Sequence, residues 1–316
     1  MQQQSALAPA GPLASRTADL WWFAFWIAAL VYLITIAFLF WSLARARSRD
    51  TVIESGSPAE RGMTRTVGIG VAVTVAILLV FLGYDLSVGR TLTPRPRKPA
   101  LTIDVTGHQW WWEATYSDTA AHETFTTANE LHVPVGEPVL FVLTSQDVIH
   151  SWWVPNLAGK KDLIPGHPQT FWFIADTAGT YRGQCAEFCG MQHAKMAMYI
   201  VAESRDRYAE WVRQQQQPAE SPSDSAQQRG HDLFVTRSCA MCHAIDGTEA
   251  GSHVGPDLTH IASRRTLAAG TLPNNRGALA GWILDPQAAK PGARMPPNAM
   301  SGADLNALVT YLESLK

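Results

Sequence analysis

The stretch HPQTFWFIADTAGTYRG, residues 167–183, decides the fold class of the middle of the chain. Its apolar runs are short and are separated by Pro and Gly, which is typical of strands joined by turns. Residues 133–146, VPVGEPVLFVLTSQ, have the same organisation. Strands at this spacing over residues 99–203 predict an all-β sandwich or barrel of ordinary domain size.

A cluster of metal-binding residue types follows directly, in GQCAEFCGMQHAKM at residues 183–196. Thiolate and thioether groups are soft ligands that suit copper, and copper also accepts imidazole. The spacing does not match the usual zinc motifs, and zinc has little use for methionine. An earlier histidine ends a strand-like run that a sandwich would bring back to this loop, although a lone histidine is often structural. The predicted copper residues are His150, Cys185, Cys189, His193 and Met196.

Composition indicates several domains, part of them in lipid. The chain has 316 residues, of which 47% are hydrophobic and 16% charged, a low charge content for a soluble protein. A net charge of −2 gives no indication of nucleic-acid binding. The four cysteines form two close pairs, which leaves none for a long-range disulfide. We expect both pairs to bind cofactors, the alternatives being local disulfides or buried inert thiols.

Two uncharged runs predict a transmembrane hairpin over residues 20–89, after an N-terminal segment at 1–19. Residues 20–44 are long enough to cross a bilayer, and residues 66–84 are just long enough. A signal peptide is the alternative for the first run. Five arginines between the runs favour a cytoplasmic loop, but basic residues also follow the second run, so charge alone does not fix the topology. The loop arginines are Arg45, Arg47, Arg49, Arg61 and Arg65, and the later basic residues are Arg90, Arg95, Arg97 and Lys98.

A polar segment separates the β-rich part from the end of the chain. Residues 213–228, RQQQQPAESPSDSAQQ, contain almost no apolar side chains, so we predict a flexible linker over 204–227. Residues 228–316 are then a separate domain. Leucines at helical spacing close it, at Leu305, Leu308 and Leu312.

Residues 239–243, CAMCH, form the attachment motif of a c-type haem. The two thiols can bond to the haem vinyl groups while the adjacent imidazole binds the iron, whereas a thioredoxin-like pair needs no histidine there. For the second axial ligand we favour Met295, which two prolines follow, over Met300 beside the last helix, and both over His253 or His260. The predicted haem residues are Cys239, Cys242, His243 and Met295.

The last domain resembles the class I cytochromes c, which are all-α, over CAMCH, GPDL at 255–258 and RMPP at 294–297. In that family the proline after the glycine, here Pro256, offers its carbonyl to the second nitrogen of the haem histidine. A simple turn role is the alternative for this proline.

The middle of the chain resembles subunit II of the haem-copper cytochrome c oxidases. The resemblance rests on GHQWWWEATY at 107–116, HSWWVPNLAGKKDLIPG at 150–166 and CAEFCGMQHAKM at 185–196. It implies a cupredoxin-like Greek-key barrel that holds two copper ions as a dinuclear CuA centre. In it, Cys185 and Cys189 bridge both coppers, and the other ligands are His150, His193, Met196 and the backbone carbonyl of Glu187.

The same resemblance suggests roles around the copper site. The side chain of Glu187 is implied to reach a magnesium ion shared with subunit I, and Trp110 to accept electrons from cytochrome c. The alternative for Trp110 is that it forms core together with Trp112. Asp162 matches an acidic docking residue. Many members of that family have a glutamate in the second membrane helix that feeds a proton channel. In this chain only Glu60 lies near that position, so we do not predict proton entry there.

The resemblance implies subunit II of a proton-pumping terminal oxidase, fused to its own cytochrome c. Electrons would pass from an external donor to one covalent haem c, then to CuA, then to haem in subunit I, where oxygen is reduced to water. Expected partners are subunits I and III, a cytochrome c or other donor, and membrane lipid. We expect the bacterial cytoplasmic membrane, with both redox domains on the periplasmic side. The alternatives are the electron-accepting subunit of a CuA-containing nitric oxide reductase and a stand-alone copper-binding haem protein.

Overall fold

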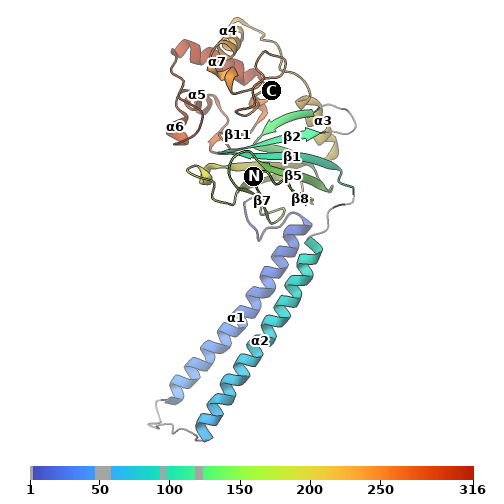
Figure 1. The fold of residues 1–316 in the computed structure, drawn as a ribbon, viewed down its shortest axis with the longest axis vertical. Coiled ribbons are helices and arrows are strands. Elements are labelled where there is room, and N and C mark those ends of the chain that lie inside the picture. Colours follow the sequence, from blue (N-terminus) through green and yellow to red (C-terminus); the bar gives the residue numbers. More distant parts are fainter. Residues whose placement is uncertain (1–2, 47–57, 93–95, 97, 118–123) are drawn as a thin grey trace. The chain divides into compact units, whose positions relative to one another are not determined.

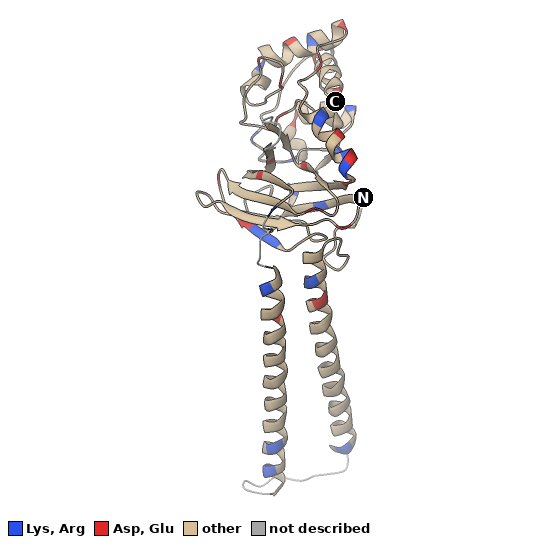
Figure 2. Cartoon of the chain, turned by 90° about the vertical axis from the view of Figure 1, so that its right-hand side faces the viewer, with Lys and Arg blue, Asp and Glu red and all other residues tan. Residues whose placement is uncertain are grey.

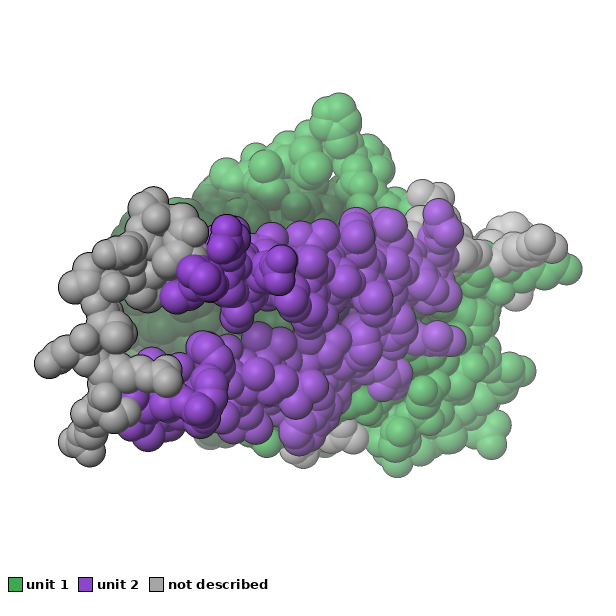
Figure 3. Space-filling view, turned by 90° about the horizontal axis from the view of Figure 1, so that it is seen from below, with its two compact units in different colours: residues 1–14, 95–316 green, residues 15–94 purple. Residues whose placement is uncertain are grey.

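The computed structural model describes residues 3–46, 58–92, 96, 98–117 and 124–316. These residues form two compact units, one of residues 15–94 and the other of residues 1–14 with 95–316 (Figure 3). Most of the loop between the two predicted membrane helices, including Arg47 and Arg49, lies outside the described residues, as do Arg95 and Arg97.

Two long helices, α1 (Pro12–Ala46) and α2 (Pro58–Leu92), form the unit of residues 15–94. Both are long and apolar enough to cross a membrane, as predicted, and the middle of each carries no charged side chain (Figure 2). Each helix begins at a proline, which fits the first helical turn because its missing N–H would have no partner there. Their aromatic faces meet, with the ring centroids of Phe23 and Tyr84 4.9 Å apart.

The predicted β-rich domain consists of two five-stranded sheets in a cupredoxin-like arrangement (Figure 1). The first sheet has the order β3 (Thr124–Ala128), β2 (Trp111–Ser117), β1 (Leu101–His108), β5 (Val139–Ser145) and β8 (Gln169–Phe173). The second has the order β4 (Glu130–Pro134), β10 (Ala197–Glu203), β9 (Gly179–Cys185), β6 (His150–Trp153) and β7 (Lys160–Leu163). The pairs β1–β5 and β4–β10 are parallel, and the other neighbours are antiparallel.

Alternation along the strands builds the core between the sheets. On β5, Val139, Phe141 and Leu143 are fully buried, while the residues between them are partly exposed. Trp112 and Trp152 are also fully buried and meet edge to face, with ring centroids 5.1 Å apart. These large rings fill the centre of the domain and fix the strands that carry the site.

The predicted flexible linker differs from the structure over residues 205–215, which form helix α3 (Arg205–Gln215). Ser204 caps the helix by accepting a hydrogen bond from the backbone N–H of Arg207. Trp211 stacks flat on His132, with ring centroids 4.2 Å apart, and meets Tyr116 edge to face. The glutamine-rich composition suggested a segment without a core, but Trp211 packs this helix against the β-domain.

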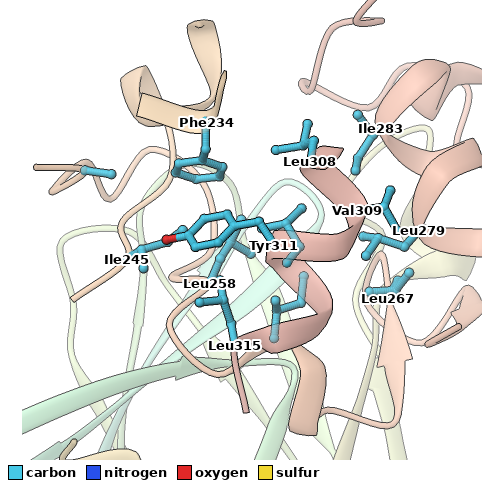
Figure 4. Close-up of a cluster of buried hydrophobic side chains, with 13 residues drawn as sticks. Phe234, Ile245, Leu258, Leu267, Leu279, Ile283, Leu308, Val309, Tyr311 and Leu315 are labelled. Carbon is cyan, nitrogen blue, oxygen red and sulfur yellow. The ribbon is translucent and has the colours of Figure 1, made fainter. Parts of the chain in front are cut away.

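The C-terminal domain is helical, as predicted. It consists of α4 (Ser225–Thr236), α5 (Arg276–Leu284), α6 (Pro286–Ala289) and α7 (Gly302–Ser314), with the 3-10 turns η2 (Ser238–Met241) and η3 (Ile261–Ser263) and the small strands β11 (Thr266–Leu267) and β12 (Leu272–Pro273). Helices α4 and α7 cross closely at Gly230, where an added Cβ would lie 2.2 Å from the carbonyl oxygen of Ala307. Phe234, Leu308 and Tyr311 belong to the buried cluster at its centre (Figure 4).

The N-terminal segment before α1 is part of the same compact unit as the β-domain. Asn156 is fully buried, and its side-chain amide donates to the backbone carbonyls of Gln3 (3.2 Å) and Ala8 (2.9 Å). The backbone N–H of Ala10 donates to the carbonyl of Asn156 at 2.7 Å. The N-terminal segment and the β-domain therefore lie on the same side of any membrane that the two helices cross.

Candidate copper and haem sites

The structure brings the predicted copper residues together at one end of the β-sandwich. Cys185 ends β9, and the loop after it leads through the 3-10 turn η1 (His193–Lys195) into β10. The backbone N–H of Cys185 donates to the carbonyl of Met196 at 2.9 Å, which closes this loop. His150 begins β6, the neighbour of β9 in the same sheet.

The two cysteine sulfurs lie at the centre of this cluster, 3.7 Å apart. Cys185 Sγ is 3.9 Å from His150 Nδ1 and 3.2 Å from the backbone oxygen of Glu187. Cys189 Sγ is 3.6 Å from His193 Nδ1 and 3.8 Å from Met196 Sδ. Each sulfur thus has its own histidine and one further donor, a symmetric arrangement that suits two soft metal ions sharing two thiolates.

The contact between the two cysteines shifts their pKa values in opposite directions. The hydrogen-bond contact between the two sulfurs lowers the pKa of Cys185 well below its ordinary value, although burial opposes the shift. The same contact, together with burial, raises the pKa of Cys189 far above its ordinary value. Thiolates are the form of cysteine that binds metal ions, so metal binding to this pair would release protons.

Asp147 orients the first histidine and was not predicted from the sequence. Its carboxylate accepts a hydrogen bond from His150 Nε2 at 2.8 Å, which leaves Nδ1 facing the sulfur of Cys185. It also accepts from the backbone N–H groups of Gln109 (2.7 Å) and Val148 (2.8 Å). Burial raises the pKa of Asp147, but these hydrogen bonds outweigh it and hold the pKa below its ordinary value. The signal in the sequence was an acidic residue three positions before a candidate ligand.

Trp110 and Trp112 have different environments. Trp112 lies in β2, is fully buried, and packs as core with its ring 5.8 Å from that of His150. Trp110 lies in the turn before β2, and its indole N–H donates to the backbone carbonyl of Cys189 at 2.9 Å. The alternative that both rings share one core face is therefore wrong for Trp110.

Of the two other residues with roles predicted around the copper site, Glu187 is exposed and Asp162 is half-buried. The Glu187 side chain is 46% exposed, and its carboxylate is 4.0 Å from Lys160 Nζ, while its backbone carbonyl faces Cys185. Asp162 lies in β7, where its backbone pairs with Ser151 of β6. The magnesium role of Glu187 and the docking role of Asp162 stay predictions.

A cavity of about 400 Å³ contains the predicted haem residues, since Cys239, Cys242, His243 and Met295 all line it. His243 Nδ1 donates to the carbonyl of Pro256 at 2.7 Å, the contact implied by the resemblance, which leaves Nε2 for a metal. An added Cβ on Gly255 would lie 2.7 Å from the His243 ring, so only glycine fits there. Burial lowers the pKa of His243 and favours the neutral, ligating form.

The other candidates for the axial position have different surroundings. Met300 packs against the buried apolar cluster of the domain and does not line the cavity. His260 is buried, and its two ring nitrogens lie 2.7 Å from the carbonyl of Lys316 and 3.1 Å from that of Gln217. Neither His253 nor His260 lines the cavity. These positions support Met295 as the axial candidate.

Comparison with known proteins identifies both parts of this chain. Residues 101–204 match the family model "Cytochrome C oxidase subunit II, periplasmic domain", and residues 227–316 match "Cytochrome c". Cytochrome c oxidase subunit 2 of Alkalihalophilus pseudofirmus is 37% identical over 99% of this chain and 91% of its own length. The protein of that name from Bacillus subtilis is 29% identical over 99% of this chain and 92% of its own. The solved periplasmic domain of subunit II from Bradyrhizobium japonicum is 33% identical, covers 37% of this chain and 94% of its own, and gives a TM-score of 0.35.

Proposed function

Because the chain belongs to the cytochrome c oxidase subunit II family and carries a cytochrome c domain, we propose that it passes electrons from an external donor, through its own haem, to a dinuclear copper centre and on to subunit I. Subunit I then reduces oxygen to water and pumps protons. We propose domain boundaries at 99–203 for the copper domain and 228–316 for the haem domain.

The observation that carries this proposal is the position of Trp110 between the two sites. Its ring lines the haem cavity, and its indole N–H binds the carbonyl of Cys189, a proposed copper ligand. Gln109 donates to the same carbonyl at 2.8 Å and holds this turn against the copper loop. The chain therefore provides a short, hydrogen-bonded route from cavity to copper site, which gives Trp110 a role in electron entry from inside the chain.

The geometry of the two candidate sites supports an assignment of the residues that would hold the cofactors. Bound haem and copper supply one-electron storage, and the protein fixes their geometry and excludes water. We propose that one haem is held by thioether bonds and by two axial ligands, and that two copper ions share both thiolates. The haem residues are Cys239, Cys242, His243 and Met295, and the copper residues are His150, Cys185, Glu187 through its carbonyl, Cys189, His193 and Met196.

The N-terminal contacts support a membrane arrangement with two crossings. Two apolar helices and a periplasmic-type subunit II domain fit a membrane protein with its redox domains outside the cytoplasm. Because residues 3–10 bind Asn156, the chain before α1 and the copper domain share one side, as a two-crossing hairpin requires. We propose the bacterial cytoplasmic membrane as the location, with subunit III, lipid, a cytochrome c donor and a magnesium ion at Glu187 as further partners.

Truncation tests the electron order. A chain that ends after Gln217 keeps α3 and the Trp211 contacts, so we expect it to insert and to bind two coppers with a mixed-valence electron paramagnetic resonance signal. The complex should lose oxygen consumption with its natural donor but keep it with a small artificial reductant. Unchanged turnover with the natural donor would show that electrons enter copper directly. One copper per chain, or zinc in its place, would sink the copper assignment.

A further inference from the structure

One short segment of the haem domain, residues 289–294, makes several contacts with the copper domain. It begins at the end of α6 and leads directly to the proposed axial ligand Met295. The side chains of Gln192 and Lys195, both in the loop of residues 185–196, donate hydrogen bonds to backbone carbonyls of this segment. We call residues 289–294 the interdomain segment. It joins the loop that carries four proposed copper ligands to the residue proposed to bind the haem iron.

Two further contacts hold the interdomain segment in place. Lys290 is buried, and its Nζ donates to the carbonyl of Trp110 in the copper domain (2.8 Å) and to that of Ala268 in the haem domain (3.3 Å). Gly292 has a φ of +86°, and an added Cβ would lie 3.1 Å from the sulfur of Met191. A side chain there would be strained and crowded, so glycine allows the two domains to approach closely.

Arg294, the last residue of the segment, contacts two polar groups of the copper domain. Its Nη2 donates to Gln109 Oε1 at 2.7 Å and lies 3.5 Å from Asp147 Oδ2. The backbone N–H of Gln109 donates to the same carboxylate oxygen at 2.7 Å. A guanidinium, an amide and a carboxylate therefore meet at one point of the boundary between the domains.

Both partners of Arg294 are bonded in turn to the candidate copper site. Gln109 Nε2 donates to the backbone carbonyl of Cys189 at 2.8 Å. Asp147 accepts from His150 Nε2 at 2.8 Å. Arg294 is thus separated by one residue from each of two proposed copper ligands, and these two ligands come from different parts of the fold.

Stability alone does not account for this arrangement. The Arg294 side chain is 64% exposed, and exposed ion pairs contribute little to the free energy of folding. A guanidinium does fix direction, because its planar donors match oxygen acceptors on neighbouring groups. The oxygens of Gln109 and Asp147 are already held by their own hydrogen bonds, so they offer Arg294 a preformed seat.

We propose that Arg294 is a positioning residue for electron transfer, which holds the segment before Met295 on the Gln109 amide and the Asp147 carboxylate and so couples the placement of the haem domain to the copper site. This inference rests on the proposed function. The guanidinium shares the Asp147 carboxylate with His150 and weakens its pull on the imidazole N–H. Outer partners of a ligating histidine set its basicity, and a less basic imidazole favours reduced copper.

Three variants of the full-length chain, purified with its complex from membranes, test this. Arg294→Gln removes the charge, and Arg294→Lys keeps the charge but lacks the planar fork. Arg229→Gln is the matched control, because the Arg229 side chain is 59% exposed, pairs with Asp304 of the same domain at 2.6 Å and does not line the cavity. Haem content comes from the pyridine haemochrome spectrum. The copper potential comes from a redox titration followed by electron paramagnetic resonance, and the haem-to-copper transfer rate from flash reduction of the haem.

We expect all three variants to bind one haem and two coppers. In Arg294→Gln the one-electron equilibrium of the copper centre should shift threefold to tenfold toward the oxidised form, where tenfold corresponds to about 59 mV. Transfer from haem to copper should slow at least threefold, because the haem domain is held less firmly. Arg294→Lys should recover most of the shift in potential and less of the rate. Arg229→Gln should match the native chain in both.

A native copper potential or a native transfer rate in Arg294→Gln, with both cofactors fully bound, would overturn the inference and leave the proposed function standing. Equal changes in Arg229→Gln would also overturn it, because the effect would then come from net charge and not from the contact. A native chain without covalent haem, or without a dinuclear copper signal, would instead refute the proposed function.

Discussion

Replacing Asp147 by asparagine should weaken copper binding although all of the proposed copper ligands remain in place. The carboxylate accepts from three donors: His150 Nε2 and the backbone N–H groups of Gln109 and Val148. An asparagine has only one acceptor oxygen, so whichever way its amide turns, an N–H group faces another donor. The negative charge that holds the imidazole also disappears.

The expected loss is large enough to measure. Removing an outer-shell partner of a ligating histidine typically costs 10- to 100-fold in metal affinity, or about 1.4–2.7 kcal/mol. Copper affinity is measured by competition with a chelator, with the copper count taken from electron paramagnetic resonance. Asp176→Asn is the control, because that residue is exposed and only its backbone makes a hydrogen bond to Ala10. An affinity within twofold of the native value would refute the orienting role of Asp147.

The remaining predictions concern the haem ligand, the pH dependence and the linker helix. Met295→Ala should abolish the thioether-to-iron absorption band and lower the haem potential, whereas Met300→Ala should leave both in place, and the reverse result would exchange the two assignments. Burial lowers the pKa of His132, but hydrogen bonds to the carboxylates of Glu130 and Glu203 outweigh burial and raise the pKa above its ordinary value. The stabilisation of the folded state by protonated His132 is therefore complete below about pH 6.5 and is lost as the pH rises through the pKa of His132 in the folded state. Melting temperatures from pH 5.5 to 8.5 should fall more steeply in the native chain than in His132→Gln, and parallel curves would contradict this. Trp211→Ala removes three aromatic contacts with the β-domain and should lower the free energy of unfolding by about 2–3 kcal/mol in urea titrations, where a change below about 0.5 kcal/mol would support the flexible linker instead.

Short motifs with strict spacing predicted which residues come together at the two candidate sites. CAMCH places the thiols and the histidine within one turn, so local geometry alone brings them to the same cavity wall. The loop of residues 185–196 works in the same way, because Cys185 ends a strand, His193 and Met196 lie in and just after a 3-10 turn, and Cys189 lies between these two elements. Apolar runs of membrane length predicted α1 and α2 directly.

The features that sequence did not predict depend on contacts between distant residues. The Lys290 ammonium donates a hydrogen bond to the carbonyl of Trp110, which lies 180 positions earlier in the chain. Nothing in the sequence around either residue indicates this contact. Trp211 precedes a glutamine-rich segment, and the polar composition of that segment led to the prediction of a flexible linker despite the single tryptophan. In both cases a single side chain is placed by a surface that exists only after the β-domain has folded.

The contact between Asn156 and the first residues of the chain has a consequence for biogenesis. Asn156 is fully buried and is satisfied by carbonyls that precede the first membrane helix. If the two helices cross a membrane, the copper domain makes these hydrogen bonds when the residues before α1 lie on its own side. A molecule inserted with its start on the wrong face would leave a buried amide unsatisfied, at a cost of about 1–3 kcal/mol. The stability of the β-domain thus depends on the orientation of the helix hairpin. We expect copper to bind most readily to molecules in which the residues before α1 and the β-domain lie on the same side.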